Sequence, residues 1–131
     1  MVKQHAVIVV ADDDPLINDL ISIVLQDEGY RVLSCTTGAE ALQVAARVRP
    51  DLVITDMQME VRDAGLQLLD RLRADPTTAE IAVIVCSADI DTLIQRASEL
   101  RQRRACVIPK PFTLDGLLTT VRQLLPIAAA R

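Results

Sequence analysis

A chain of 131 residues, half of them hydrophobic, is long enough to fold as one domain around its own core. The net charge of −4 argues against nucleic acid as a direct partner, because phosphate binding needs a net basic surface. No apolar run reaches the length of a membrane span and no signal-peptide pattern opens the chain, which predicts a cytoplasmic protein without membrane contact.

Apolar runs typical of buried strands alternate with apolar residues at helical spacing. In chain order we expect a strand at 6–10, a helix at 16–25, a strand at 31–35, a helix at 39–48, a strand at 52–55, a helix at 66–72, a strand at 82–86, a helix at 90–97, a strand at 105–108 and a helix at 114–125. Five strands alternating with five helices predict an α/β fold, a doubly wound parallel sheet with helices on both faces. We assign residues 1–131 to one domain, with its core at about 6–125.

Single residues mark where the first helix begins and ends. Asp14 stands directly before Pro15, as an N-cap before a proline at the first helical position does. Gly29 is the expected end of the same helix. The first strand therefore leads into its helix through a loop that contains three successive aspartates.

Other polar residues have less specific explanations. His5 is expected to be an exposed side chain near the N-terminus. The basic run Arg101–Arg104 either complements the end of a helix or belongs to a partner-binding face. The cysteines all lie in predicted strands, which indicates buried free thiols in a reducing compartment: Cys35, Cys86 and Cys106.

Polar side chains follow the predicted strands where each strand ends. Asp12 and Asp13 follow the first strand, Asp56 the third, Ser87 the fourth and Lys110 the fifth. Ligands bind at the carboxyl ends of the strands in an open parallel sheet, so we expect these side chains to converge. Two strand-end aspartates alone would fit a solvated turn, and the full set makes a binding site the better interpretation.

Three neighbouring carboxylates favour a bound cation. Two carboxylates about 4 Å apart repel by roughly 4 kcal/mol at an effective dielectric constant near 20. Oxygen ligands with open positions suit Mg²⁺, which shares a phosphate oxygen and keeps several waters. A cation, a lysine and a carboxylate together suit phosphoryl transfer, in which Asp56 is the candidate nucleophile.

Four motifs in register resemble the receiver domains of two-component response regulators. They read "VVADDDP", "DLVITDM", "VIVCSA" and "IPKPF", and the resemblance extends from about Ala6 to Leu125. It implies a flavodoxin-like fold with strand order 2-1-3-4-5. It also implies phosphorylation of Asp56 by a sensor histidine kinase or a phosphotransfer protein, and a peptide bond between Lys110 and Pro111 that is often cis.

The resemblance assigns a role to each residue of the site. Ser87 would bind a phosphoryl oxygen and report phosphorylation, and Lys110 would pair with the phosphate. The ligands implied for Mg²⁺ are the side chains of Asp12, Asp13 and Asp56 and the backbone carbonyl of Gln58. An unknown effector would bind the face formed by the fourth helix, the fifth strand and the last helix, and a homodimer remains open.

The sequence departs from the family pattern at two places. The segment "DMQMEVRDAG" has Glu60 in place of a proline, Arg62 in place of a second methionine and one extra residue before Gly65. The switch aromatic, three residues before the lysine, is replaced by Val107. Phosphorylation can be intact while its coupling to the surface is altered.

Two alternative functions remain. A pseudo-receiver would keep the fold as an interaction module without being phosphorylated, although the acidic residues and the lysine that such proteins lose are present. A phosphohydrolase of the haloacid-dehalogenase type would use Asp56 as nucleophile, but it needs another aspartate where this chain has Gln58. The chain itself is not expected to be an enzyme beyond its own phosphorylation and dephosphorylation. The sequence fits both a single-domain regulator and the receiver of a longer protein.

Overall fold

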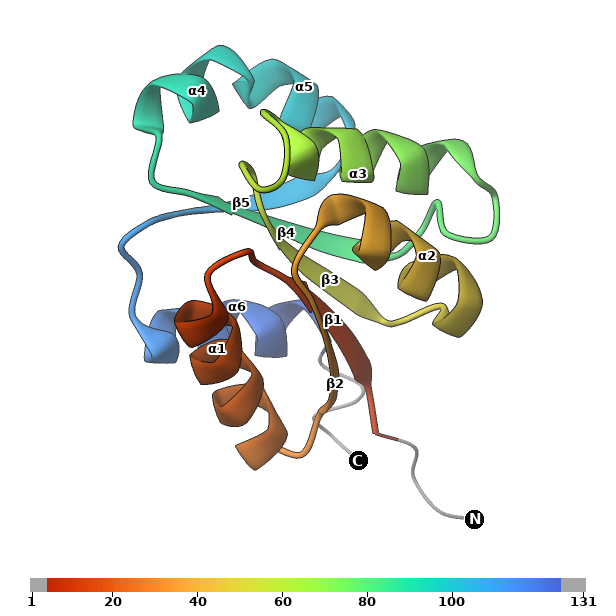
Figure 1. The fold of residues 1–131 in the computed structure, drawn as a ribbon, viewed down its shortest axis with the longest axis vertical. Coiled ribbons are helices and arrows are strands. Elements are labelled where there is room, and N and C mark those ends of the chain that lie inside the picture. Colours follow the sequence, from red (N-terminus) through yellow and green to blue (C-terminus); the bar gives the residue numbers. More distant parts are fainter. Residues whose placement is uncertain (1–4, 126–131) are drawn as a thin grey trace.

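Five parallel strands form one sheet in the order β2-β1-β3-β4-β5 in a computed structural model, which describes residues 5–125 (Figure 1). The strands are β1 (Val7–Ala11), β2 (Arg31–Cys35), β3 (Leu52–Asp56), β4 (Ala82–Ser87) and β5 (Ala105–Pro109). The helices are α1 (Pro15–Asp27), α2 (Gly38–Val48), α3 (Ala64–Ala74), α4 (Ile90–Gln95), α5 (Ala97–Gln102) and α6 (Leu114–Leu124). The predicted fold class and strand order are confirmed, and both ends of the predicted domain lie outside the described residues.

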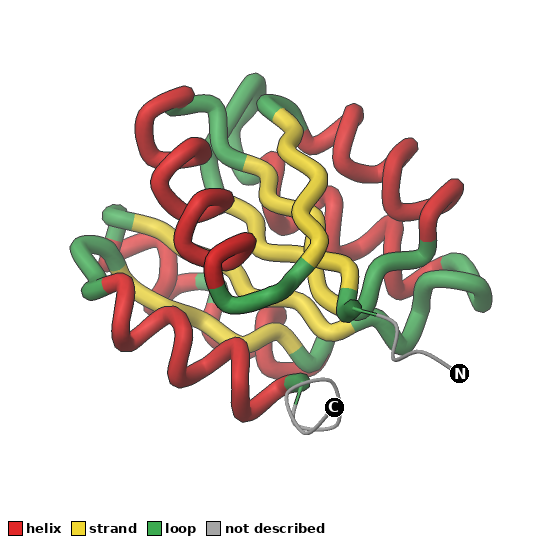
Figure 2. Tube along the Cα trace, turned by 90° about the horizontal axis from the view of Figure 1, so that it is seen from below, coloured by secondary structure: helices red, strands yellow, loops and turns green. Residues whose placement is uncertain are grey.

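The helices cover both faces of the sheet. Helices α1 and α6 lie on one face, and α2, α3, α4 and α5 lie on the other (Figures 1 and 2). Successive strand residues point to opposite faces, so Val9 packs with the second group of helices while Ile8 and Val10 pack with the first. Burying a Val, Leu or Ile side chain contributes roughly 1.5–3 kcal/mol to the stability of the fold. The two cores therefore hold the strands, and with them the residues at the strand ends, in fixed positions.

The strand register brings the carboxyl ends of three strands to one edge. Asp56 at the end of β3 lies opposite Cys86 of β4, and Ser87 of β4 lies opposite Pro109 of β5. Lys110 follows Pro109 directly. The backbone alone therefore brings Asp56, Ser87 and Lys110 to neighbouring strand ends.

The first helix begins and ends at the expected residues. Asp14 is its N-cap, and the Asp14 carboxylate accepts hydrogen bonds from the N–H groups of Leu16 and Ile17. The helix ends at Asp27, and Gly29 has a φ of 99°, a left-handed conformation that glycine adopts without strain. This cap fixes how the chain passes from β1 into α1, the segment that carries Asp12 and Asp13.

The single helix expected at 90–97 is wrong. The structure has two short helices, α4 and α5, which meet at Arg96. Arg96 has φ −99° and ψ 6°, which interrupts the helical path. The periodicity of apolar residues continues through the break because Leu93 and Leu100 are both buried in the same core, so the pattern could not reveal it.

The remaining sequence expectations have mixed outcomes. His5 is exposed, and Arg101–Arg104 spans the end of α5, where Arg103 donates to the carbonyl of Glu99. All three cysteines are free, but only two are buried, since Cys106 on the edge strand β5 is half-buried. No helix within residues 5–125 combines the length and apolar character needed to cross a membrane.

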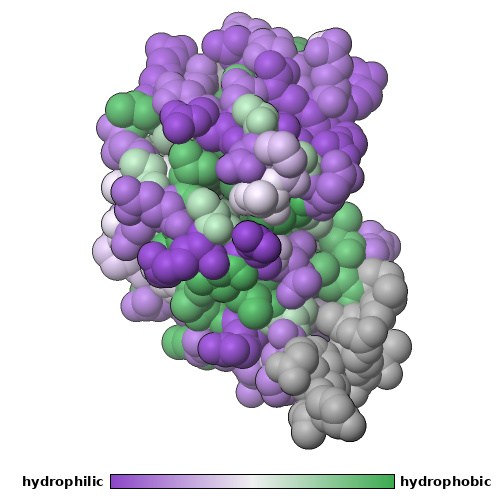
Figure 3. All heavy atoms as spheres, turned by 90° about the vertical axis from the view of Figure 1, so that its right-hand side faces the viewer, coloured by the Kyte–Doolittle hydropathy of each residue, from purple (hydrophilic) through white to green (hydrophobic). Residues whose placement is uncertain are grey.

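Apolar and hydrophilic side chains interleave on the side of the molecule seen at the right of Figure 1 (Figure 3). A hollow at the start of β1 and β2 is lined by apolar residues that include Val7, Tyr30 and Val32, together with Arg31 and Arg47. The carboxyl ends of the strands, by contrast, gather acidic groups.

Candidate functional site

Asp12 is buried directly after β1. The Asp12 backbone N–H donates to the carbonyl of Cys35 at 3.1 Å, and its carboxylate accepts the N–H of Asp14 at 2.9 Å. Only 3% of Asp12 is exposed, whereas the neighbouring Asp13 is exposed. A carboxylate in such a position needs a compensating charge, because burial penalises its ionised form.

Asn18 holds the segment that carries the two aspartates, and the sequence reasoning missed it. The buried Asn18 amide donates to the carbonyl of Asp12 at 3.0 Å and to that of Cys35 at 2.8 Å. The Asn18 side-chain oxygen accepts a hydrogen bond from Ser22. The sequence offered no distinct signal for this role, since an asparagine four residues after the N-cap is an ordinary helical residue.

Asp56 ends β3 and is fixed by its neighbours. The Met57 N–H donates to the Asp56 carboxylate at 3.1 Å, and the Thr55 hydroxyl donates to the Asp56 carbonyl at 2.9 Å. The backbone of α3 passes close by, since a Cβ added to Gly65 would lie 2.3 Å from the Asp56 carbonyl oxygen. Only glycine permits this approach, and it sets the path of the loop between β3 and α3.

Lys110 connects the two buried carboxylates. The Lys110 ammonium lies 3.2 Å from the Asp12 carboxylate and 3.3 Å from the Asp56 carboxylate, and donates to both. The Lys110 backbone N–H donates to the carbonyl of Ser87 at 2.8 Å. Ser87 is 2% exposed, and its hydroxyl oxygen accepts the N–H of Asp89 at 3.0 Å. The peptide between Lys110 and Pro111 is cis.

The pKa values of Asp56 and Lys110 are both raised, for different reasons. Burial raises the pKa of Asp56 above its ordinary value, although the Lys110 ammonium opposes that effect. Burial lowers the pKa of Lys110, but the carboxylates of Asp56 and Asp12 outweigh it and raise that pKa overall. Lys110 therefore supplies a cation within 3.3 Å of both carboxylates.

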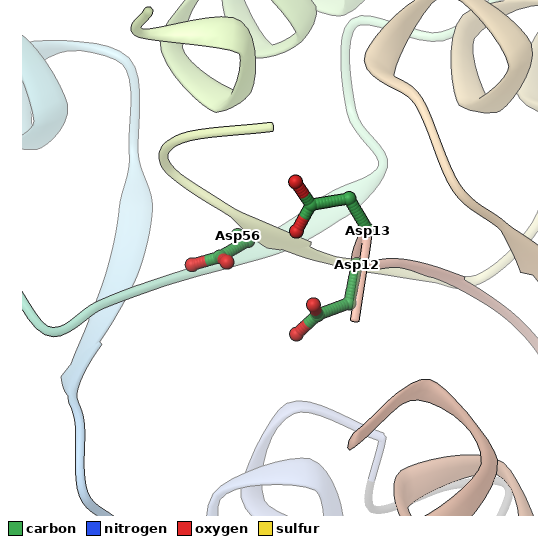
Figure 4. Close-up of side chains that lie close together, drawn as sticks. All are labelled: Asp12, Asp13 and Asp56. Atoms are coloured by element: carbon green, nitrogen blue, oxygen red, sulfur yellow. The ribbon is translucent and has the colours of Figure 1, made fainter. Parts of the chain in front are cut away.

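The carboxylates of Asp12, Asp13 and Asp56 project to the same side of the strand ends (Figure 4). One oxygen from each lies within 4.8 Å of the others. Within residues 5–125, the backbone carbonyl oxygen of Gln58 accepts no hydrogen bond. Oxygen donors of this kind, with room for water, fit Mg²⁺ better than a softer transition metal.

The atypical loop between β3 and α3 is held at two points. Gln58 and Asp63 bond reciprocally, with the Gln58 amide donating to the Asp63 carboxylate at 3.0 Å and the Asp63 N–H donating to the Gln58 side-chain oxygen at 2.6 Å. Glu60 accepts the N–H groups of Gly38 and Ala39, at 2.9 and 3.1 Å, at the start of α2. Burial would raise the pKa of Glu60, but these two hydrogen bonds bring it below its ordinary value.

Val107 lies apart from the acidic cluster on β5, where 38% of the residue is exposed. It belongs to the lining of a groove together with Leu93, Leu100 and Arg104. Val107 thus stands on a surface formed by α4, α5 and β5, and no aromatic ring is present at its position.

Known proteins resemble this chain in sequence over most of its length. The family described as response regulator receiver domain matches residues 8–122. A curated relative, the DNA-binding dual master transcriptional regulator RpaA of Synechocystis, is 33% identical over 118 residues, which are 90% of this chain and 48% of that protein. Sporulation initiation phosphotransferase F of Bacillus subtilis is 29% identical over 92% of this chain and 94% of its own length.

A solved response regulator has the same fold as this chain. The chemotaxis response regulator CheY4 of Vibrio cholerae is 28% identical, with a TM-score of 0.83 over 93% of this chain and the whole of that one. The chain spans about half the length of several curated relatives that it matches, including RpaA and the response regulator MprA of Mycobacterium leprae. It spans nearly all of sporulation initiation phosphotransferase F.

Proposed function

The chain belongs to the response regulator receiver domain family, and on this basis we propose that it accepts a phosphoryl group on Asp56 from a histidine kinase or a phosphotransfer protein. The observation that carries the proposal is the position of Lys110, within 3.3 Å of the carboxylates of both Asp56 and Asp12. A cation placed between two carboxylates suits a site where negative charge accumulates during a reaction.

In the proposed reaction, a carboxylate oxygen of Asp56 attacks the phosphorus of a phosphohistidine. An O–P bond forms, the N–P bond breaks, and the imidazole nitrogen leaves with the electron pair and takes up a proton. The Lys110 ammonium stabilises the Asp56 carboxylate before the transfer and pairs with the phosphoryl oxygens afterwards. The Ser87 hydroxyl oxygen accepts the Asp89 N–H at the neighbouring strand end, and its own O–H would donate to a phosphoryl oxygen.

Asp12, Asp13 and Asp56 would hold Mg²⁺ together with the backbone carbonyl of Gln58. When bound, this cation would neutralise charge shared between the carboxylates and the phosphoryl oxygens. The support is the oxygen-only donor set within 4.8 Å and the free carbonyl of Gln58. Asp13 is the exposed member of the set. Its carboxylate can therefore exchange bound water for a cation without any change in the fold.

The partners follow from the same proposal. An unidentified effector would bind the face formed by α4, β5 and α6, and a second copy of the chain is an alternative occupant. Free cysteines are the usual state in a reducing compartment, which supports a cytoplasmic location. The relative named as a phosphotransferase matches this chain over 94% of its own length, which supports a domain that can act in phosphate relay by itself.

The proposal is tested by incubating the protein with a small phosphodonor, with and without Mg²⁺, and measuring the intact mass. We expect the mass gain of one phosphoryl group in the wild type with Mg²⁺ and none in Asp56→Asn, because the amide is a far poorer nucleophile. Asp115→Asn, an exposed change on α6, is the matched control and should behave like the wild type.

Each outcome separates the alternatives. Phosphate at the wild-type level in Asp56→Asn would place the acceptor elsewhere. No mass gain in the wild type, with Mg²⁺ binding intact, would favour a pseudo-receiver. Asp13→Asn should abolish Mg²⁺-dependent phosphorylation, and unchanged phosphorylation in this variant would overturn the assignment of the metal ligands.

A further inference from the structure

Asp63 occupies a constrained position at the start of α3. Its φ is 58°, in the left-handed region that aspartate and asparagine tolerate better than most residues. In this conformation the Asp63 N–H and carboxylate both face Gln58, which they bind through the two reciprocal hydrogen bonds. The orientation of Gln58 is therefore set by Asp63, five residues further along the chain.

The other oxygen of the Asp63 carboxylate is paired with Arg96, 33 residues away in sequence. The Arg96 guanidinium lies 3.0 Å from Asp63 and 2.9 Å from Glu99. The Asp63 side chain is 17% exposed and that of Arg96 is 39% exposed, so the pair is partly shielded from water. Because Arg96 is also the residue where α4 ends and α5 begins, it joins the loop to the break between these helices.

We propose that Asp63 and Arg96 are positioning residues for the backbone carbonyl of Gln58, and that through them cation binding at the acidic site is coupled to the α4–α5 break. The proposal rests on the proposed function, since it takes the Gln58 carbonyl as a ligand. Any rotation of Gln58 that carries its carbonyl toward a cation moves its side chain, and with it Asp63 and Arg96. Loss of the Asp63–Arg96 pair frees Asp63 and with it Gln58, so the carbonyl is held less firmly and cation binding weakens. Because coupling is reciprocal, cation binding in turn acts on the pair.

This connection gives the chain a second path from the site to its surface. The family's switch aromatic is absent, and Val107 is stiff about χ1, so its few rotamers sweep little volume. The α4 side chains Ile90 and Ile94 are 48% and 69% exposed on the helix that ends at Arg96. A shift at the break therefore changes how an apolar stripe is presented to a partner.

The test is a titration of the ¹⁵N-labelled full chain with Mg²⁺ alone, followed by amide chemical shifts. Asp63→Asn keeps the oxygen and the N–H that bind Gln58 and removes only the charge that binds Arg96. Arg96→Gln removes the opposite charge, Arg96→Lys preserves it, and Arg101→Gln is a matched control on the exposed face of α5.

In the wild type we expect Mg²⁺ to shift the amides of residues 12, 13, 56 and 58 and also those of residues 94–100. Asp63→Asn and Arg96→Gln should each raise the Kd for Mg²⁺ by about three- to fivefold, toward the upper end of the range for a partly exposed ion pair. Both should lose the shifts at 94–100. The double variant should be no weaker than either single variant, and Arg96→Lys and Arg101→Gln should stay within about twofold of the wild type.

The coupling is refuted by an unchanged Kd in both single variants, by additive effects in the double variant, or by wild-type shifts that end before residue 94. A purely structural role would lower the melting temperature and leave the Kd and the shifts unchanged, which also refutes it. In all these cases the shifts at residues 12, 13 and 56 survive. Their absence in the wild type would instead overturn the metal site of the proposed function, and the coupling with it.

Discussion

Replacing Gly65 by alanine tests how tightly α3 is packed against the end of β3. The added Cβ would lie 2.3 Å from the carbonyl oxygen of Asp56 and 2.9 Å from the Cα of Met57. Ordinary contact begins at 3.4 Å, so the two backbones must separate by about 1 Å. Both obstructing atoms belong to the backbone, and neither can rotate away. Overpacking of this kind costs about 1–3 kcal/mol.

The intrinsic helix propensity of alanine acts against this steric cost. Alanine is favoured over glycine in a helix by roughly 0.5–1 kcal/mol, so a helix considered alone would be stabilised. We expect the steric cost to win by up to about 2.5 kcal/mol, which lowers the melting temperature by up to roughly 10 °C in thermal unfolding. The matched control is Gly116→Ala in α6, where the new Cβ meets only the Thr113 side chain at 3.0 Å, and its effect should stay within about 1 kcal/mol.

Gly65→Ala also reports on the site, because a displaced Asp56 backbone moves the Asp56 carboxylate away from Lys110. Mg²⁺ should then stabilise Gly65→Ala less than it stabilises the wild type. A melting temperature equal to that of the wild type, together with an equal response to Mg²⁺, would show that the loop between β3 and α3 yields freely. The close approach would then not be what places Asp56.

Three other changes test separate contacts. Asn18→Ala leaves two buried carbonyls without their side-chain donor, so urea unfolding should show a loss of about 1–3 kcal/mol, and a loss below about 0.5 kcal/mol would contradict the anchoring role. Lys110→Met leaves Asp12 buried without its counter-charge. This variant should lose about 1–3 kcal/mol of stability in Mg²⁺-free buffer and regain part of that loss with Mg²⁺. A stability that does not depend on Mg²⁺ would refute the role of the counter-charge. Glu60→Gln should cost about 0.3–1 kcal/mol at pH 7, since a carboxylate at a helix N-terminus stabilises it. The pKa of Glu60 is lowered in the folded state, so its contribution is complete above its unfolded pKa and is lost as the pH falls through the folded value. The difference between wild type and Glu60→Gln should therefore narrow below about pH 4.3, and a constant difference would show that the charge is irrelevant.

The sequence alone was sufficient for the fold and for the composition of the site. Buried strands of a parallel sheet are apolar on both faces, and amphipathic helices repeat every 3.6 residues, so both are visible in local pattern. Once the sheet is parallel, the carboxyl ends of the strands must share one edge. That geometry made the meeting of Asp12, Asp13, Asp56 and Lys110 predictable from their places in the chain.

The sequence did not reveal how the loop between β3 and α3 is held. The sequence showed only that this loop departs from the family pattern, at Glu60, at Arg62 and by one extra residue. The structure uses Glu60 to cap α2, 22 residues earlier. The break at Arg96 was equally hidden, because apolar periodicity passes through it. Hydrogen bonds between distant segments depend on the spacing of packed elements to within a fraction of an ångström, and no local pattern encodes that spacing.

Dependence on distant segments also explains why the sequence did not reveal the roles of Asn18 and Gly65. An asparagine in a helix is locally unremarkable, and it becomes an anchor only when the carbonyls of Asp12 and Cys35 come within reach of its amide. A glycine early in α3 weakens the helix by itself, and only the passage of the Asp56 backbone beside it makes it necessary. Local sequence specified which elements form and which charges meet, while tertiary packing determined which side chains hold those charges in place.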